Sequence, residues 1–571
     1  CLITKSQNDL GELSCNPSIG GVAKGIIVRE IDALDGVMSK VIDKSGIHFK
    51  VLNKSKGPAV WGPRAQADRE LYKENLQNIL LNYKNLDILY DVVDDIIISN
   101  NRVSGVICNN TEISSSSVVI TSGTFLNGVI HIGKTTYAGG RFGERSITAL
   151  AEKLKSYKFK IGRLKTGTPP RVSKKSINWE ILEEQVGDET PQPFSDFTES
   201  ILQKQIPCHI TYTNDKTHQI INHNLSQSAI YSGNITSIGP RYCPSIEDKI
   251  VKFKDKKRHQ VFLEPEGLES DLIYPNGIST SLPQNIQEEF VRTIAGLEQV
   301  KFIRYGYAIE YDFIDPRELE ETLESKKIKN LYFAGQINGT TGYEEAAGQG
   351  IVAGANAALK LQNKEFILSR SDSYIGVMIN DLVSFGTQEP YRMMTSRAEY
   401  RIKLRSDNAA ERLTDIGNQY GLLTAEKLQN YADTLSKKNK IKHILKTKKI
   451  IDGYKNIDEL LSKNILAIKQ LKKHFPEIID ADERILINIF AENLYKDYEK
   501  RLAKDIEILQ SDKKITIPNT INFNEINGLS NEIKTKLENS SPKTIADIKR
   551  IQGMTPSALI TIIIHIKKLR G

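Results

Sequence analysis

The character of the sequence changes at about residue 401, and this change limits the possible fold more than any other feature. Before that point, short apolar runs alternate with glycine-rich turns and helical stretches. After it, charged residues and Leu or Ile recur at helical spacing, and glycine is sparse. The pattern predicts a mixed α/β body followed by an all-helical domain. At ~100–200 residues per domain, a chain of 571 residues holds about three or four domains.

Runs of β-branched and apolar residues with the length of strands support the α/β assignment. In the tail, residues 545–568 predict a helix, a turn at Gly553 and a second helix, and residues 512–517 predict a loop. Residues 173–205 are polar, acidic and weakly periodic, which indicates either a mobile insertion or a plain surface loop. The predicted strands lie at residues 47–52, 86–90, 96–99, 103–108, 116–121, 229–232, 260–263 and 331–334.

Composition and cysteine usage exclude several classes of protein. Hydrophobic residues make up 39% and charged residues 26%, as in ordinary globular proteins. No window approaches the ~18 uninterrupted apolar residues of a membrane span, so we expect no membrane partner. The widely spaced cysteines contain no Cys-x-x-Cys pair and form no cluster with the nine histidines, so we expect a reducing, cytoplasmic location and no metal. The five cysteines are Cys1, Cys15, Cys108, Cys208 and Cys243.

The positive charge of the chain belongs to its tail. Residues 401–571 contain 32 Lys and Arg against 22 Asp and Glu, whereas residues 1–400 contain 46 against 48. Residues 434–451 hold seven lysines and no acidic residue. Such a run is most often a solvated helix face, and the competing interpretation is a surface that contacts a polyanion.

The chain has no strand followed by Gly-x-Gly-x-x-Gly and a helix, the unit that places a pyrophosphate at a helix N-terminus. Either there is no Rossmann cofactor site, or this unit precedes residue 1. The sequence opens on Cys1 with no Met and no signal segment, and residues 2–4 resemble the end of a strand. We therefore expect a fragment that begins after its first βα unit and binds a dinucleotide weakly as given.

Two small-residue turns favour a cofactor site. Residues 116–124 form a buried-type strand that ends in Ser122 and Gly123, where a backbone can approach a ligand closely. Residues 331–350 form a strand, a glycine-rich turn and a helix rich in Ala and Gly, whose first amides would face a ligand. Tight helix packing is the alternative explanation, and it suits Gly350 and Gly354 better than ligand binding does.

Two cysteines lie in segments that favour thiolate chemistry. Cys15 lies in the turn-rich segment 14–25 at a predicted helix start, where the helix N-terminus would stabilise a thiolate. Cys243 lies between Pro240 and Pro244, near the cationic Arg241 and Lys249. A buried, inert thiol is the alternative for each.

Taken in order, these segments resemble the glucose-inhibited division protein A family, the large FAD-binding subunit of the bacterial tRNA wobble-uridine modification enzyme. The resemblance covers nearly the whole chain, and the block at residues 239–249 is its most specific part. The matching segments are residues 15–25, 54–66, 162–171, 239–253, 263–282, 305–316, 334–358, 389–405 and 526–533.

The resemblance implies the fold and its domains. We expect an α/β, FAD/NAD-binding Rossmann-like body with an inserted domain, followed by an all-helical C-terminal domain. Residues 1–170 would form the FAD-binding domain without its first βα unit, and residues 301–400 its second part. Residues 171–300 would form an inserted NAD-binding or substrate domain, and residues 401–571 would bind tRNA and a partner GTPase. Members of the family are homodimers that form a heterotetramer with the GTPase.

The resemblance also implies a reaction at C5 of the wobble uridine of tRNA, position 34, which gains a carboxymethylaminomethyl or aminomethyl group. Methylenetetrahydrofolate gives the one-carbon unit, glycine or ammonium gives the amine, and NADH reduces the FAD. Two alternatives are a folate- and FAD-dependent tRNA uracil methyltransferase and a non-catalytic scaffold that binds tRNA or a partner. The helical tail speaks against the first, and the two matched cysteines speak against the second.

Site residues follow from the family motifs. Cys15 and Cys243 match the family's cysteines as nucleophile and acid/base group, without a decision on which attacks. FAD contacts are implied at Val93, Ser146 and Gln336. Arg397, Arg401 and Arg405, after Arg392, would share a helix face toward tRNA phosphates, unless they form surface ion pairs with Glu399 and Asp407. NAD contacts are implied at Gly239, Pro240, Arg241, Tyr242, Pro244, Ser245, Ile246, Glu247, Asp248, Lys249, Ile250, Val251, Lys252 and Phe253.

Overall fold

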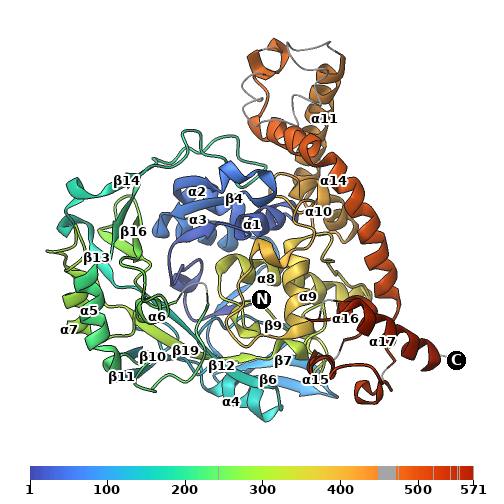
Figure 1. The fold of residues 1–571 in the computed structure, drawn as a ribbon, viewed down its shortest axis with the longest axis horizontal. Coiled ribbons are helices and arrows are strands. Elements are labelled where there is room, and N and C mark those ends of the chain that lie inside the picture. The colour runs from blue at the N-terminus through green and yellow to red at the C-terminus, as the bar shows by residue number, and fades with distance from the viewer. Residues whose placement is uncertain are drawn as a thin grey trace.

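The computed structural model confirms the division into an α/β body and a helical tail (Figure 1). Among the described helices, none combines the length and the apolar character that a membrane crossing requires. In Figure 1 the sheets and helices of the body surround the central helices, and the tail runs along one side. The structure describes residues 1–241, 244–447, 471–473, 475–518, 520–540, 542–549, 551 and 553–569.

The centre of the body consists of helices packed on two short strand pairs and one three-stranded sheet. Its elements are β1 (Leu2–Thr4), β2 (Ser18–Gly20), α1 (Lys24–Ala33), α2 (Met38–Ser45), β3 (Gly46–Leu52), β4 (Gly62–Ala67), α3 (Arg69–Leu81), β5 (Ile88–Tyr90), β9 (Val118–Ile120), β20 (Leu331–Phe333), α8 (Tyr343–Leu359) and α9 (Tyr374–Phe385). β1 pairs in parallel with β5, and β9 pairs in parallel with β20. β20 is buried along its whole length, which explains its uninterrupted apolar sequence.

Helix α8 packs closely against α1 and α9 because it is rich in small residues. A Cβ built on Gly348 would lie 3.1 Å from Ile375 and 3.5 Å from Ile27. No described atom lies within 4 Å of a Cβ built on Gly350 or Gly354, so the expectation that these two glycines serve packing is wrong. Gly348 alone of the three faces the neighbouring helices.

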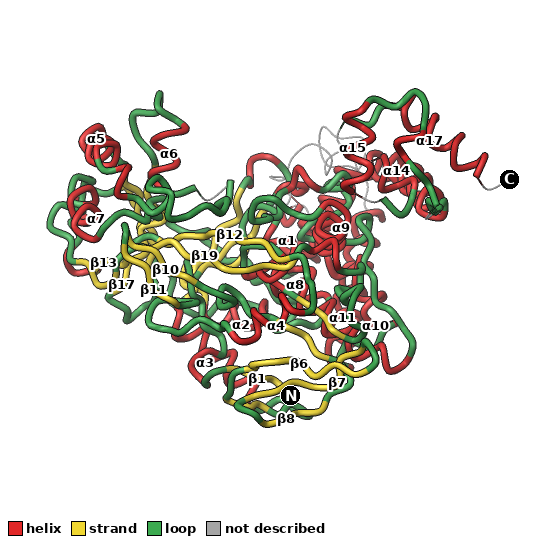
Figure 2. Tube along the Cα trace, turned by 90° about the horizontal axis from the view of Figure 1, so that it is seen from below, coloured by secondary structure: helices red, strands yellow, loops and turns green. Residues whose placement is uncertain are grey.

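Two further sheets complete the body. Their elements are β6 (Val93–Ser99), β7 (Arg102–Cys108), β8 (Thr111–Ser114), β10 (Val129–Ile132), β11 (Thr135–Ala138), α4 (Ala149–Ser156), β12 (Ile161–Thr168) and β19 (Tyr307–Ile314). β6, β7 and β8 form one antiparallel sheet, and β11, β10, β19 and β12 form the other in that order. In Figure 2 the first lies beside β1 at one edge of the body, and the second crosses its middle.

A unit with its own core follows β12. Its elements are β13 (Arg171–Ser173), β14 (Glu183–Gln185), β15 (Cys208–Tyr212), α5 (Asp215–His223), α6 (Ile246–Lys252), β16 (Gln260–Pro265), β17 (Leu272–Asn276), α7 (Gln284–Val291) and β18 (Phe302–Arg304). The strands form one six-stranded antiparallel sheet in the order β14, β15, β16, β17, β13 and β18. Buried residues such as Leu263, Phe290 and Leu297 form the core between this sheet and its helices.

Seven of the eight predicted strands coincide with β3, β5, β6, β7, β9, β16 and β20, and one is wrong. Residues 229–232 form a turn, closed by a hydrogen bond from Ser232 N to Ser228 O. Ala229 is buried there against Ile235 and Ala308. The apolar residues of this run are therefore buried by a turn, which a pattern of apolar positions cannot distinguish from a strand.

Residues 186–206 form a strap across α1 and α2, which Figure 1 shows above the central helices. The backbone N–H groups of Phe194 and Ser195 each donate to the Asp43 carboxylate at 2.8 Å. The Phe194 side chain is fully buried and packs near Phe49. The segment is therefore anchored in the core, and the expectation of a plain surface loop is wrong.

The helical tail has two cores. Its helices are α10 (Ala409–Gln419), α11 (Ala425–Thr447), α14 (Glu483–Lys514), α15 (Asn531–Ser540), α16 (Ile545–Lys549) and α17 (Pro556–Leu569). Residues of α11 and α14 pack with Trp61 and Val51 of the body, whereas α15 to α17 form a separate small core. α16 and α17 confirm the predicted helix pair around Gly553, but α14 extends to Lys514, so only the end of the predicted loop at 512–517 lacks helix.

Candidate functional site

The loop that carries Cys15 is fixed through its backbone. The Tyr343 hydroxyl at the start of α8 accepts a hydrogen bond from Cys15 N at 2.7 Å. The Arg69 guanidinium donates to Cys15 O at 2.8 Å. The segment that carries Cys15, residues 14–25, therefore meets the glycine-rich segment 331–350 in space. The expected helix start is wrong in one respect, because β2 and a glycine turn separate Cys15 from Lys24, where α1 begins.

The thiol of Cys15 is exposed and lies against a buried tyrosine. Its Sγ is 3.2 Å from the hydroxyl of Tyr274 on β17. The Arg171 guanidinium lies 4.6 Å from the centroid of the Tyr274 ring, and it is itself held by Glu266 at 3.0 Å. The exposed cysteine thus lies beside a hydroxyl that can share a hydrogen bond with its sulfur, an arrangement that suits a nucleophile.

Glu266 organises the cationic side of the site. It pairs with Arg171 and also with Arg69, at 2.8 Å. Although burial opposes ionisation, these two guanidinium groups hold the pKa of Glu266 below its ordinary value. The carboxylate thus stays charged and fixes both arginines, one beneath Tyr274 and one at the Cys15 carbonyl.

A second polar network holds the residue after the cysteine. The Asn16 side chain donates to Glu264 at 2.7 Å and accepts from Gln66 at 3.1 Å. Arg64 also binds Glu264, whose side chain is 1% exposed. These contacts join the Cys15 loop to β4 and β16, which sequence spacing could not have revealed because the partners are up to 248 residues apart.

A buried ion cluster connects the glycine turn after β2 with the start of α8. The Lys24 ammonium lies 2.9 Å from Glu344 and 3.0 Å from Glu345. Glu344 also accepts from Gly20 N at 2.7 Å. Burial opposes the charge of Lys24, but the two carboxylates outweigh it and raise the pKa of Lys24. Sequence reasoning missed this cluster, although a Lys and two Glu among small apolar helix residues are its signal.

The segment expected to bind NAD is only partly available to a ligand. Tyr242 and Cys243 lie outside the described residues. Ser245 caps α6, while Ile246 and Ile250 are buried in the core, so these two side chains do not face a nucleotide. Glu247 is fully buried and accepts from Ser281 N at 2.9 Å.

The other residues of this segment differ in accessibility. Lys249 donates to Gly277 O at 2.6 Å. Asp248 faces Lys252 at 3.3 Å, and Phe253 is 53% exposed. A ligand can therefore reach the members of the block that are at least partly exposed, among them Asp248, Lys249 and Phe253.

The residues expected to contact FAD lie on three separate elements. Gln336 follows β20, and its Oε1 is 3.6 Å from a Cβ built on Gly123 after β9, so the two small-residue turns meet. Val93 begins β6, and Ser146 lies in the loop before α4. Only Gln336 lies beside a second turn that the sequence had indicated.

The arginines expected to face tRNA do not share a helix. Residues 395–397 form one short turn, and turns and loops continue to Asn408. Arg401 is exposed, and the Arg397 side chain is 34% exposed with its guanidinium 4.3 Å from the Tyr391 ring centroid.

Arg405 is fully buried between Asp407, at 3.0 Å, and Glu499. A surface role for Arg405 is therefore wrong in this structure, because its charge is already neutralised inside the protein. The expected ion pair with Asp407 exists but is buried, and Glu399 pairs with Arg370 instead.

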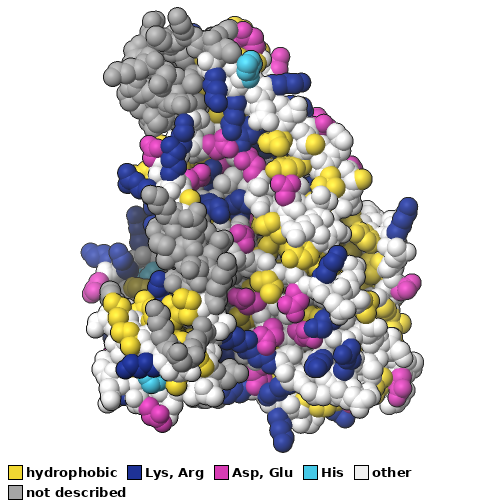
Figure 3. Space-filling view, turned by 90° about the vertical axis from the view of Figure 1, so that its right-hand side faces the viewer, with side chains coloured by type: hydrophobic (Ala, Val, Ile, Leu, Met, Phe, Trp, Pro, Cys, Tyr) yellow, Lys and Arg dark blue, Asp and Glu magenta, His cyan; other side chains and the backbone are white. Residues whose placement is uncertain are grey.

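Charge on the tail side of the molecule is mixed. Figure 3 shows Lys and Arg side chains lying among Asp and Glu on this face. On α11, Lys438 lies between Glu411 and Glu492, and Lys442 also binds Glu492. Lys448 and Lys449 of the lysine run lie outside the described residues. The described part of the run thus supplies both ion pairs and exposed lysines.

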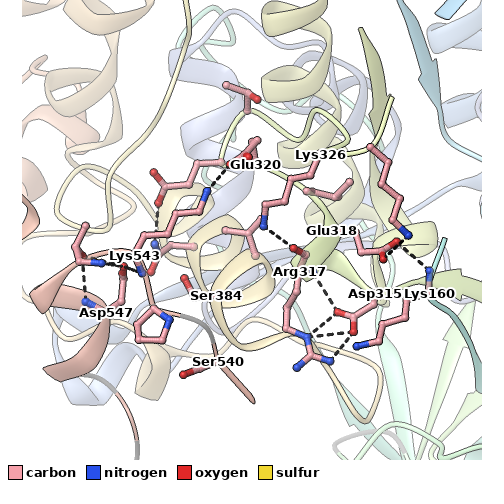
Figure 4. Close-up of a pocket in the computed structure, with 18 of the residues that line it drawn as sticks. Lys160, Asp315, Arg317, Glu318, Glu320, Lys326, Ser384, Ser540, Lys543 and Asp547 are labelled. Carbon is pink, nitrogen blue, oxygen red and sulfur yellow. Dashed lines mark hydrogen bonds and ion pairs between the residues drawn. The ribbon is translucent and has the colours of Figure 1, made fainter. Parts of the chain in front are cut away.

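A polar cleft of about 960 Å³ separates the body from the small core of the tail (Figure 4). Lys543 from the tail binds Glu320 of the body at 2.7 Å, and Asp547 accepts from Thr544 N. On the body side, Arg317 pairs with Asp315. Lys543 and Glu320 thus pair across the cleft, whereas Arg317 and Asp315 pair within the body wall.

Comparison with known proteins agrees with this arrangement. The family described as "Glucose inhibited division protein A" matches residues 1–365, and the "tRNA modifying enzyme MnmG/GidA C-terminal helical bundle" matches residues 505–571. A Buchnera aphidicola protein named "tRNA uridine 5-carboxymethylaminomethyl modification enzyme MnmG" is 50% identical over 99% of this chain and 93% of its own length. A Thermodesulfovibrio yellowstonii protein of the same name is 48% identical over 99% and 94%.

A solved structure has the same fold over nearly the whole chain. Aquifex aeolicus GidA, in its form I crystal, is 46% identical, has a TM-score of 0.88, and matches 99% of this chain and 95% of its own. The form II crystal gives the same TM-score. The chain therefore belongs to the glucose inhibited division protein A family of tRNA-modifying enzymes.

Proposed function

We propose that this chain modifies C5 of the wobble uridine of tRNA, at position 34, adding a carboxymethylaminomethyl or aminomethyl group. The observation that carries the proposal is the exposed Cys15 thiol held 3.2 Å from the buried Tyr274 hydroxyl, with Arg171 behind that ring. The names of the relatives from Buchnera aphidicola and Thermodesulfovibrio yellowstonii support the same reaction.

The chemistry explains why a thiolate is needed. Uracil C5 is a poor nucleophile until a thiolate adds to C6 and the C5=C6 electron pair becomes part of an enolate. C5 then bonds to the one-carbon unit, a base removes the C5 proton, and loss of the thiolate restores the double bond. We assign the nucleophile and the acid/base group to Cys15 and Cys243, without deciding between the two roles.

The turns after β9 and β20 fit an FAD. The two strands are parallel neighbours, so their carboxyl ends meet, which is where ligands bind in open α/β sheets. Gly123 and Gly335 follow them with φ of +57° and +89°, and Gln336 lies between them. Bound there, FAD would supply the redox chemistry of the one-carbon transfer.

The other cofactors are NADH as reductant and methylenetetrahydrofolate as one-carbon donor. Val93 and Ser146 would contribute to the FAD site. The accessible part of residues 239–253 would bind NADH.

The partners and domains follow the same proposal. Residues 1–170 and 301–400 would form the FAD-binding domain, residues 171–300 the inserted domain, and residues 401–571 the domain for tRNA and a GTPase. The excess of ten positive charges in residues 401–571 supports contact with tRNA. We expect a homodimer that forms a heterotetramer with the GTPase in the cytoplasm.

The test is modification of unmodified tRNA by the chain with FAD, NADH, methylenetetrahydrofolate, glycine and the partner GTPase, followed by mass spectrometry of the nucleosides. Cys15→Ser and Cys243→Ser should each abolish the product, while Cys1→Ser, an exposed control, should not. A 5-methyluridine product would identify a uracil methyltransferase instead. Tight tRNA binding without any product would identify a scaffold.

A further inference from the structure

Phe142 is an exposed aromatic ring close to the Cys15 loop. It is 45% exposed, whereas the ring of Tyr307, on which it packs, belongs to a residue that is 6% exposed. Its ring packs on that of Tyr307, with centroids 6.2 Å apart and an angle of 30° between the planes. Phe142 N also donates to the Tyr307 hydroxyl at 3.4 Å. A single exposed apolar side chain is ordinary, but one held rigidly on a buried aromatic ring offers a fixed flat surface.

The loop that carries Phe142 is tied to the Cys15 loop. Arg141 donates to the Ser14 hydroxyl at 3.1 Å, next to the cysteine, and to Asp9 at 2.6 Å. Tyr307 is 6% exposed, and burial raises its pKa. The hydrogen bond from Arg141 to Ser14 thus joins the loop that carries Phe142 to the segment that carries Cys15.

The surroundings of the ring suit a flat, electron-rich partner. The Arg304 guanidinium lies 5.6 Å from the Phe142 ring centroid. The next residue, Gly143, has φ of +80°, and no described atom lies within 4 Å of a Cβ built on it. Aromatic rings and arginine planes are the groups on which proteins stack unpaired RNA bases.

The proposed reaction requires such a surface. A thiolate can reach C6 of a uracil only when the base is unstacked from its neighbours. Unstacking costs a few kcal/mol, which stacking on a protein ring offsets. Cys15 and Tyr274 alone provide no exposed ring on which a base can stack. An aromatic residue near the Cys15 loop provides one.

We infer that Phe142, together with Arg304, is a stacking platform for an unpaired base of the RNA substrate beside the uridine that is modified. This inference rests on the proposed function and specifies how the same site holds its substrate. The platform recognises a base by its flat face and makes no contact that would distinguish one base from another. It contributes to RNA binding and to presentation of the uridine, and it takes no part in the covalent steps.

The experiment measures binding of a fluorescein-labelled anticodon stem-loop RNA to the full chain by anisotropy. Phe142→Ala should weaken binding by about tenfold or more, whereas Phe142→Trp should stay within about twofold. Tyr83→Ala, which removes a 58% exposed ring elsewhere on the body, is the matched control and should bind like the wild type. Stem-loops with one abasic position each identify the stacked base, because Phe142→Ala should have no further effect on that RNA.

Two further measurements distinguish base stacking from a change in the thiol or in the assembly of the protein. The rate of Cys15 alkylation and the molecular mass by light scattering should be the same in Phe142→Ala and the wild type. Unchanged RNA affinity in Phe142→Ala would overturn the inference, and so would a change in mass, which would show that the ring covers a protein surface. Failure of the wild type to bind any anticodon stem-loop would overturn the proposed function as well.

Discussion

The Lys427 ammonium of helix α11 lies 2.7 Å from the Asp32 carboxylate of helix α1, and the two side chains are 1% and 0% exposed. Asp196 of the strap lies 3.1 Å from the same ammonium and 2.6 Å from Arg29. This buried charge cluster, Arg29, Asp32, Asp196 and Lys427, joins three segments that are far apart in sequence. It fixes the helical tail and the strap to the helix that follows the Cys15 loop.

Removing Lys427 should therefore destabilise the whole protein. Lys427→Met leaves Asp32 and Asp196 facing each other with only Arg29 as counter-charge, and breaking a buried pair costs about 3–5 kcal/mol. We expect a clear fall in the midpoint of thermal unfolding, measured by circular dichroism. Lys440→Met, at an exposed position of the same helix, is the control and should change the midpoint little. Equal midpoints for Lys427→Met and the control would show that the cluster contributes no net stability.

Asp43 should give the stability a component that depends on pH. Burial raises the pKa of Asp43 to about 6, although Phe194 N and Ser195 N donate to its carboxylate. The unfolded chain has an ordinary Asp pKa of about 3.9, so the folded state binds the proton more tightly. The contribution of Asp43 to the free energy of unfolding is therefore complete below about pH 4 and is lost as the pH rises through 6. This contribution changes by about 3 kcal/mol.

The measurement compares the free energy of unfolding in urea for the wild type and Asp43→Asn at pH 4, 5, 6 and 7. Groups far from Asp43 titrate alike in both proteins, so the difference between the two proteins reports Asp43 and the charges near it, such as Asp32. We expect the advantage of the wild type over Asp43→Asn to shrink as the pH rises. A difference that stays constant over this range would show that Asp43 does not titrate there.

Tyr274 should control the reactivity of Cys15. Tyr274→Phe keeps the ring that Arg171 contacts but removes the hydroxyl 3.2 Å from the sulfur. A hydrogen bond to a charged group is worth about 1.5–3 kcal/mol, and roughly half of this appears in the rate of thiolate attack. Alkylation of Cys15 by iodoacetamide at pH 7, followed by peptide mass spectrometry, should slow about three- to tenfold.

The control for this prediction is Tyr83→Phe, which changes an exposed hydroxyl elsewhere on the body. It should leave the alkylation rate of Cys15 at the wild-type value. Cys208 offers an internal reference, because burial raises its pKa to about 12 and its thiolate is scarce at pH 7. Equal alkylation rates in Tyr274→Phe and the wild type would show that the Tyr274 hydroxyl does not affect the reactivity of Cys15.

Local patterns predicted the elements that bear the site but not the contacts that complete it. Segments 14–25 and 331–350 were recognisable because glycine and small residues mark turns and close packing. The contact between Cys15 and Tyr343 that joins these segments could not be predicted, because it spans 328 residues. A cysteine in a sequence also does not indicate which tyrosine it contacts. The family resemblance supplied Cys15, and the structure supplied Tyr274 and Arg171 around it.

Two of the incorrect predictions have a common physical origin. Arg405 was expected at the surface because its spacing of four from Arg401 would place both on one helix face, yet its partner Glu499 lies 94 residues away. Residues 173–205 were expected to be a surface loop because they are polar, yet Phe194 within them is buried in the core. In both cases one long-range contact outweighs the average character of the segment.

Of the three arginines expected to face tRNA, Arg397 and Arg401 should contact RNA, whereas Arg405 should have a structural role. Charge reversal at Arg397 and Arg401 should weaken tRNA binding and make its dependence on salt shallower, by about 0.7–0.9 in the logarithmic slope for each phosphate that is no longer neutralised. Lys84→Glu, which reverses one charge at an exposed position of the body, should leave the slope unaltered. Filter binding between 50 and 200 mM salt, the range in which ~6–10 phosphate contacts change affinity most visibly, measures both slopes.

Arg405→Ala should behave differently, because Arg405 is buried between Asp407 and Glu499. Its removal leaves a buried carboxylate without its counter-charge, so thermal unfolding should shift while the salt slope of the remaining folded protein stays as in the wild type. An altered slope in Arg405→Ala at a temperature where the variant is folded would place this arginine on the RNA. Unaltered binding after reversal of both Arg397 and Arg401 would instead move the RNA contact away from this part of the chain.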